Sequence, residues 1–271
     1  MTKGTKRASP GADDEKSPLA SVELSDEDAK KLDDVRKDIQ RAELILEREA
    51  QKKLIPVYEK RRQVVKTIPK FWPIALLNHS LFAIHAQHTA DQLALAYLED
   101  LWIDRDPNEL RCYTIEFHFK ENPHFHDKVL KKEYKYVPAL AAAGEQADAD
   151  GLTESMLDFS WERDVEPSVT KINWKDADKA LTKLYPRKVS DDDDEDLDEP
   201  TDAGSFFNYF EEKSDPLEVG LNIANEIFPE AIDYFLGTAG GDDLDSEDEE
   251  DDDDEAEEID LEKPKTKKQK V

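Results

Sequence analysis

Residues 25–68 read SDEDAKKLDDVRKDIQRAELILEREAQKKLIPVYEKRRQVVKTI, and this stretch decides the fold. Ser25 followed three residues later by Asp28 is typical of a helix start, with Asp in place of the usual Glu. The apolar residues after it recur at spacings of mostly three and four, which places them in one stripe along a helix. A helix of about 44 residues is about 66 Å long at about 1.5 Å per residue, which is too long to lie on one small domain.

The apolar stripe of this long helix predicts a partner helix. A narrow apolar stripe on a long helix usually packs against another helix, so we expect a homodimer. The residues expected in the dimer interface are Leu32, Val35, Ile39, Ala42, Leu46, Leu54 and Val57. Pro56 is the one helix breaker and predicts a kink, because it removes a backbone hydrogen bond. The alternative is two shorter helices, broken at Pro56 and packed on the chain's own core.

Farther along the chain, the apolar periodicity changes to two and predicts a sheet. Residues 112–119 and 129–137 alternate apolar with polar side chains, and Glu121-Asn122-Pro123 is a turn signal between them. Residues 157–161 and 169–174 are expected to supply two more strands. The result is an antiparallel sheet of about four strands with one polar face.

Helical spacing returns on both sides of the predicted sheet. Residues 89–101 form an expected amphipathic helix, and residues 217–236 form two short helices divided at Pro229. Glycines after residue 236 end the fold. The predicted fold class is therefore α+β, with a long dimerisation helix, a four-stranded antiparallel sheet and C-terminal helices.

The charge of the chain is concentrated in two blocks. Acidic residues number 66 against 37 Lys and Arg, for a formal net charge of −29. Residues 242–262 hold 16 acids and residues 191–199 hold 8, with no Lys or Arg in either block, so together they carry −24. Every Trp, Tyr and Phe lies between Tyr58 and Phe235, a region long enough for one sizeable core.

These shifts in composition predict four parts of the chain. They are a disordered tail over 1–23, the long helix over 24–69, a folded domain over 70–237 with flexible loops at about 139–167 and 188–204, and an acidic disordered tail over 238–271 that ends in a basic segment. No apolar run approaches membrane-spanning length, and one cysteine allows no intramolecular disulfide. We therefore expect a soluble intracellular protein without a membrane partner.

Residues that look like chemistry have simpler interpretations. His118, His124 and His126 fall at a strand end and a turn without a paired cysteine or an acidic cage, so no metal is expected. Cys112 is expected to be a small core residue. The sequence has no Gly-rich phosphate loop and no G-x-S-x-G motif. No catalytic residue or cofactor is predicted, and the chain is not expected to be an enzyme.

Several motifs, in order along the chain, resemble one known family. They are IPKFWPIALLNH at 68–79, YTIEFHFKENPHF at 113–125 followed by KVLKKEY at 128–134, INWK at 172–175, SFFNYF at 205–210 and IFPEAIDYFL at 227–236. Over about residues 24–236 the chain resembles the nucleosome assembly protein family of histone chaperones. Within that family it looks closest to the SET, or template-activating-factor, branch.

This resemblance implies both a fold and a function. The family fold pairs long helices antiparallel in a dimer and carries an α+β domain on each side, like an earmuff. Its members bind core histones, as the central pair of the nucleosome, the flanking pair or both, and act in nucleosome assembly, disassembly and chromatin remodelling. The matching residues on the acidic underside are Glu211, Glu212, Asp215, Glu218, Glu226, Glu230 and Asp233. Because residues 191–199 are acidic here, any contact with DNA is expected to be weak or indirect.

The C-terminal end of the chain is basic, and two alternative functions remain open. Lys267, Lys268 and Lys270 fit a short nuclear-import signal, so we expect a nuclear protein that could also shuttle to the cytoplasm. One alternative function is an accessory regulator, either a histone acetyltransferase cofactor or a phosphatase inhibitor. Another is a generic acidic scaffold that binds any polycation.

Overall fold

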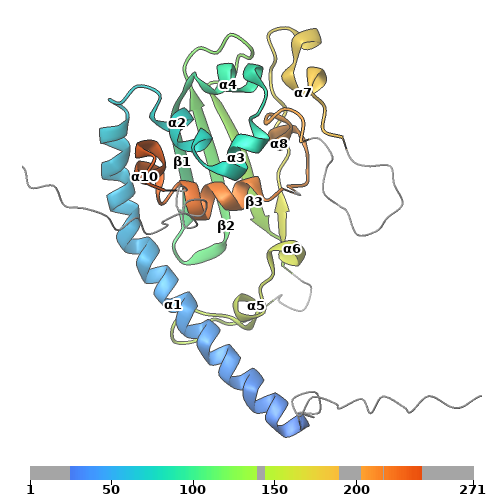
Figure 1. Ribbon diagram of the computed structural model, residues 1–271. Coiled ribbons are helices and arrows are strands. Elements are labelled where there is room, and N and C mark those ends of the chain that lie inside the picture. The colour runs from blue at the N-terminus through green and yellow to red at the C-terminus, as the bar shows by residue number, and fades with distance from the viewer. Residues whose placement is uncertain (1–24, 139–143, 189–202, 216, 240–271) are drawn as a thin grey trace, which may run out of the picture.

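The computed structural model describes residues 25–138, 144–188, 203–215 and 217–239. The predicted N-terminal tail, the two acidic blocks and the three import lysines lie outside these residues. Within them, one long helix runs diagonally past a four-stranded sheet, and its N-terminal part extends beyond the rest of the fold (Figure 1). None of the described helices is both long and apolar enough to cross a membrane.

The long helix, α1 (Asp26–Val65), begins where its capping residue predicts. The Ser25 side chain accepts a hydrogen bond from the backbone N–H of Asp28, at 3.1 Å, and three acids in the first turn favour the positive end of the helix dipole. The helix continues through Pro56. The alternative of two helices broken at this proline is therefore wrong.

Three short helices follow α1 and lead into the sheet. They are α2 (Phe71–Leu77), α3 (Ser80–His85) and α4 (Thr89–Leu95). The expected amphipathic helix over 89–101 is wrong in its second half, because residues from Leu98 onward form a strand. A bulge between Leu98 and Asp100 and the burial of Asp100 break the alternation that would have revealed this strand in the sequence.

The sheet has four antiparallel strands in the order β1-β2-β3-β4. Its strands are β1 (Leu98–Asp106), β2 (Glu109–Phe119), β3 (Val129–Tyr136) and β4 (Val165–Pro167). The predicted hairpin of residues 112–119 and 129–137 is confirmed, and Glu116 lies opposite Lys131 on its polar face. On the other face, side chains such as Ile115 and Phe117 are fully buried.

The two other predicted strands are wrong. Residues 157–161 lie between and within two short helices, α5 (Glu154–Leu157) and α6 (Trp161–Asp164), so part of the expected flexible loop over 139–167 is folded. Residues 169–174 have one isolated bridge, between Trp174 and Phe125. The N–H groups of Ile172 and Asn173 bond to carboxylates of Glu211 and Asp127, whereas a strand would bond to neighbouring backbone.

Short helices at the C-terminal end complete the core. They are η2 (Ala177–Lys179), α7 (Leu181–Leu184), α8 (Asn208–Glu211), α9 (Val219–Asn222), the π-helical turn η3 (Ile223–Ile227) and α10 (Ala231–Leu236). Phe210 of α8 packs edge-on against Phe117 of the sheet, with ring centroids 5.2 Å apart. Phe235 of α10 stacks on Phe71 of α2 at 4.8 Å. A fully buried ring such as Phe210 contributes roughly 1.5–3 kcal/mol, so aromatic contacts hold α8 on the sheet and α10 on α2.

Candidate functional surfaces

The predicted dimer stripe lies on the solvent-exposed side of α1. All seven predicted interface residues are exposed in the single chain, with Leu46 at 69%, Val57 at 57% and Ile39 at 54%. Ile39 and Val57 are 18 residues apart, which is five turns at about 3.6 residues per turn, so they share one face. A row of exposed apolar side chains on one helix is typical of a surface that packs against another chain.

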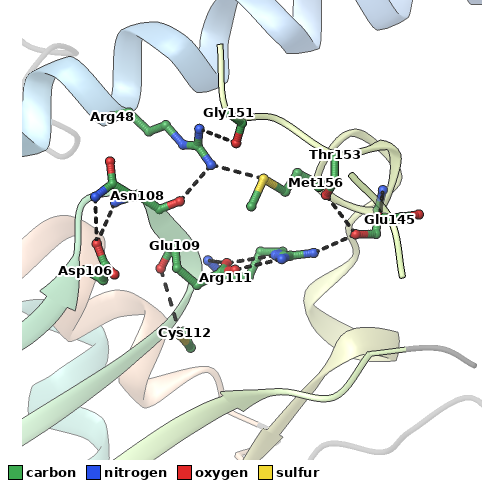
Figure 2. Close-up of polar contacts among 11 residues, drawn as sticks. Arg48, Asp106, Asn108, Glu109, Arg111, Cys112, Glu145, Gly151, Thr153 and Met156 are labelled. Carbon is green, nitrogen blue, oxygen red and sulfur yellow. Dashed lines mark hydrogen bonds and ion pairs between the residues drawn. The ribbon is translucent and has the colours of Figure 1, made fainter. Parts of the chain in front are cut away.

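The opposite side of α1 is joined to its own domain by arginines. Arg62 donates to the buried carboxylate of Asp100 at 2.6 Å and lies over the Trp102 ring at 4.6 Å. Farther down the helix, Arg48 is buried and donates to the carbonyl oxygens of Asn108 and Gly151 at 2.7 and 2.9 Å (Figure 2). The helix is therefore anchored along one face, while its apolar face is exposed among the residues that the structure describes.

Arg48 is part of a contact that fixes the segment between β3 and α6. Figure 2 shows its guanidinium between the β1–β2 turn at Asn108 and the segment from Gly151 to Met156, whose sulfur lies 3.0 Å away. About two turns earlier along α1, Arg41 pairs with Asp148 and Asp150. The guanidinium of Arg41 holds the pKa of the Asp148 carboxyl well below its ordinary value. This region of the fold is thus tied to α1.

Of the seven acids predicted on the underside, Glu211, Glu212 and Asp215 are only partly exposed and bond to other parts of the fold. The Glu211 carboxylate accepts from the Ile172 N–H, the Trp174 indole and the Thr182 hydroxyl. Glu212 pairs with Arg187 at 2.7 Å. These bonds support α8 and the neighbouring loops, which favours structural roles for Glu211 and Glu212.

Asp215 is the third acid with internal partners. Its carboxylate accepts from the Tyr134 hydroxyl at 2.5 Å and from the N–H groups of Val219 and Gly220 at 3.0 and 2.9 Å. It therefore holds the start of α9 against the sheet, as a capping carboxylate does. The bond also favours the neutral form of Tyr134, whose pKa is raised mainly by burial.

The other four acids face solvent. Glu218, Glu226, Glu230 and Asp233 are all exposed, and Glu226 lies 3.0 Å from the imidazole of His79. Residues 214–239 contain five carboxylates and no Lys, Arg or His. We call Glu218, Glu226, Glu230 and Asp233 the acidic surface, since nothing basic within their own segment neutralises them.

Glu162 is an exposed acid near this surface that the sequence analysis did not predict as a site residue. Glu162 is exposed on α6 and lies close to Asp215 and Glu218 around a shared hollow. Glu162 was not predicted because the alternation over residues 157–161 predicts a strand in place of the helix that carries it. The signal that could have found it is Ser160 four residues before Asp164, since the Ser160 N–H donates to that carboxylate and begins the helix.

The residues that resembled chemistry have ordinary surroundings. His118 bonds to Glu116 at 3.0 Å, and in the described part of the chain no three His, Cys, Asp or Glu side chains are grouped to hold a metal ion. The Cys112 sulfur lies 3.9 Å from the carbonyl oxygen of Glu109, and burial raises the pKa of its thiol (Figure 2). A raised pKa disfavours the thiolate that a nucleophile needs.

Comparisons with known proteins give consistent results. The family model described as nucleosome assembly protein matches residues 63–238. Protein SET of Drosophila melanogaster is 29% identical over 187 residues, which cover 67% of this chain and 60% of that protein. NAP1-related protein 2 of Oryza sativa subsp. indica is 31% identical over 201 residues, covering 71% and 68%.

The fold also has relatives among solved structures. The crystal structure of Ccp1 matches with a TM-score of 0.56 and 20% identity, covering 81% of this chain and 98% of that one. At this identity the match concerns the fold alone. The chain spans about 60% of the length of several full-length relatives, including Protein SET and the nucleosome assembly protein 1;2 of rice.

Proposed function

The chain belongs to the nucleosome assembly protein family, and from this premise we propose that it is a homodimeric, non-enzymatic histone chaperone. One observation carries the proposal: residues 214–239 present an acidic surface without a single basic side chain, on a domain anchored to a helix whose apolar face is free. The proposed partners are core histones, as the central pair, the flanking pair or both.

The physical basis is charge complementarity with selective geometry. Histones present many Lys and Arg, and an acidic protein surface screens them as the DNA phosphates do. Attraction between the two surfaces acts over a Debye length of about 8 Å at physiological salt, so it speeds encounter and weakens as salt rises. In this proposal the folded acidic surface gives selectivity, and the acidic blocks at 191–199 and 242–262 add strength and rate.

The proposed dimer brings two such domains together. Its interface is the stripe of Leu32, Val35, Ile39, Ala42, Leu46, Leu54 and Val57, which in the single chain exposes large apolar side chains to water. Burying apolar area contributes about 25 cal/mol per Å², so pairing two such stripes is strongly favoured. A twofold arrangement lets the same stripe meet itself.

Cellular roles follow the same premise. We propose a nuclear protein, imported by way of Lys267, Lys268 and Lys270, that shuttles and touches DNA only weakly. Regulation of a histone acetyltransferase or a phosphatase stays an alternative. The proposed division of the chain is the one predicted from composition, with the binding domain at residues 70–237.

The test is a precipitation assay with purified full-length chain. At physiological salt the wild type is expected to keep each histone pair from precipitating on DNA. The variant E226Q/E230Q/D233N removes three charges from the acidic surface and is expected to bind at least fivefold more weakly by titration. The matched control E99Q/E121Q/E154Q removes three exposed charges elsewhere and is expected to bind like the wild type.

The contrary outcomes are equally defined. Equal loss in both triple variants, or equal binding of polylysine and histones, would show that the chain is only a generic acidic scaffold. A chain truncated after residue 241 that loses all binding would assign the function to the acidic tail alone. Capture of an acetyltransferase or a phosphatase from nuclear extract in place of histones would favour the accessory role.

A further inference from the structure

A hollow of about 280 Å³ lies beside the acidic surface, between the edge of the sheet, α6 and the start of α9. We call it the Trp161 pocket; its lining includes Tyr134, Trp161, Glu162, Asp215, Glu218 and Leu221. Its volume falls just below the roughly 300–1,000 Å³ of sites that enclose a whole small molecule. A space of this size suits one side chain of a larger partner.

Two aromatic rings form rigid walls of the pocket. The buried Tyr134 ring stacks on Tyr113, with centroids 4.7 Å apart, and its hydroxyl is held by Asp215. The Trp161 ring packs edge-on against Tyr113 at 5.4 Å and against Phe159 at 5.3 Å. Trp161 is only half-buried, so part of its ring remains accessible in the pocket. The faces of such rings carry negative charge density that attracts cations.

Three carboxylates surround these rings. Asp215 is fixed by its three donors, while Glu162 and Glu218 are exposed at the mouth. No Lys or Arg is among the described residues that line the pocket, and none of these three carboxylates forms an ion pair within the described chain. The lining of the pocket therefore combines three carboxylates and an aromatic wall without a basic side chain, and the buried ammonium of Lys132 attracts Asp215 from outside that lining.

We propose that the Trp161 pocket binds a single lysine or arginine side chain of a basic protein partner. The apolar stem of that side chain lies along Leu221 and Val165, its cationic head meets the accessible part of the Trp161 ring, and the carboxylates supply charge-assisted hydrogen bonds. The proposal rests on the proposed function for the identity of the partner, a histone. The pocket gives the acidic surface one defined anchor point for recognition.

The test follows the indole signal of Trp161 by NMR in the full-length chain labelled with ¹⁵N-tryptophan. The chain has four Trp, and the variant W161F identifies the signal of interest. The probes are capped tripeptides Gly-Arg-Gly and Gly-Lys-Gly, with the neutral analogues that carry citrulline or acetyllysine in the middle. We expect the cationic probes to shift the Trp161 signal in a saturable way and the neutral probes to leave it unchanged.

Matched variants locate the binding. E162Q/E218Q changes two exposed side chains, so it leaves the fold intact and is expected to weaken the cationic probes at least fivefold. E226Q/E230Q removes the same charge outside the pocket and is expected to bind them like the wild type. The proposal would be wrong if cationic and neutral probes shifted the Trp161 signal equally. It would also be wrong if both double variants bound the cationic probes equally weakly. A stronger effect of one cationic probe identifies the preferred side chain.

Histone titrations of the same variants separate this inference from the proposed function. If the wild type binds histones but E162Q/E218Q binds them equally well, the pocket is wrong and the chaperone proposal stands. If the cationic probes bind Trp161 while histones do not bind the chain, the pocket stands and its partner is another basic protein.

Discussion

Lys132 is a fully buried amine on the inner face of β3. Its ammonium donates to the backbone carbonyl of Glu212 at 2.6 Å and lies 5.2 Å from the Tyr209 ring centroid. Burial lowers the pKa of Lys132 from its ordinary 10.5 to about 8. The folded chain therefore releases this proton at a lower pH than the unfolded chain does.

The consequence is a measurable pH dependence of stability. Between pH 8 and 10.5 the unfolded state binds more protons at this residue than the folded state, so the free energy of unfolding rises with pH in that interval. Between pH 7 and 9 we expect a gain of about 1 kcal/mol from Lys132, measured by urea unfolding. K132M is the control, since its unfolding free energy lacks this contribution. An identical slope in both proteins would contradict the prediction.

Gly220 is a position where only hydrogen fits. A Cβ placed on Gly220 would lie 1.8 Å from the Tyr134 hydroxyl oxygen, which itself bonds to Asp215. We expect G220A to lower the unfolding free energy by about 1–3 kcal/mol, because the ring must move in a packed core. N222A on the same helix adds no such clash and is expected to stay within about 0.5 kcal/mol of the wild type. Unchanged stability of G220A would show that the ring moves freely.

At the scale of elements, patterns of neighbouring residues predicted those helices, strands and turns whose bonds form between residues close together in the sequence. The long helix, the hairpin of β2 and β3 and the glycine after α10 follow from capping, alternation and turn residues near one another in sequence. β1 escaped because its buried Asp100 depends on Arg62, 38 residues earlier, which no pattern in the strand reveals. Residues 169–174 do not form a strand, because the backbone N–H groups of Ile172 and Asn173 bond to the carboxylates of Glu211 and Asp127, which come from other parts of the chain.

In the candidate site, too, some features could be predicted from the sequence and others could not. Exposure of Glu226, Glu230 and Asp233 was predictable from helical spacing on a short acidic segment. The internal bonds of Glu211 and Asp215 were not, because their partners Thr182 and Tyr134 come from distant segments. An acid in a matching motif is therefore as suited to holding the fold as to binding a partner, and contacts alone separate the two roles.

The attachment of the segment from Asp148 to Met156 to α1 gives an element-scale prediction. Arg48 is buried and donates mainly to backbone carbonyls, so R48M leaves the Asn108 and Gly151 oxygens without their donor and should cost about 1–3 kcal/mol. Arg41 forms exposed ion pairs, so R41M should cost less than about 1 kcal/mol.

Hydrogen exchange measures this difference directly. In R48M the amides of Gly151 and Leu152, which bond within the Asp148 turn, should exchange at least tenfold faster than in the wild type. In R41M they should change less. Equal exchange in R48M and the wild type would mean that this segment holds its place without α1.

At the scale of the whole molecule, α1 serves two surfaces at once. Arg48 and Arg62 fix its inner face to the domain, and its outer face presents the apolar stripe. Because the helix is anchored to its own domain, pairing of two helices in the proposed dimer would also set where the two acidic surfaces lie. A partner with several basic patches would then meet both surfaces in one complex, which would raise its affinity through effective concentration.

The stripe therefore predicts what separates the dimer without unfolding the domain. I39D/L46D places two charges in the expected interface, where each would be buried without a partner, and should convert the dimer to a monomer by light scattering. The far-UV circular dichroism of the domain should change little, because both side chains are exposed in the single chain. The urea midpoint should fall only by the stabilisation that dimer formation supplies to the folded state. The control variant is K52D/Q63D, whose two residues lie away from the stripe at a rotation of about 100° per residue, and it should remain dimeric.

An unchanged mass for I39D/L46D would exclude the stripe as the interface. A monomer that binds a histone pair at least tenfold more weakly would tie the paired acidic surfaces to function.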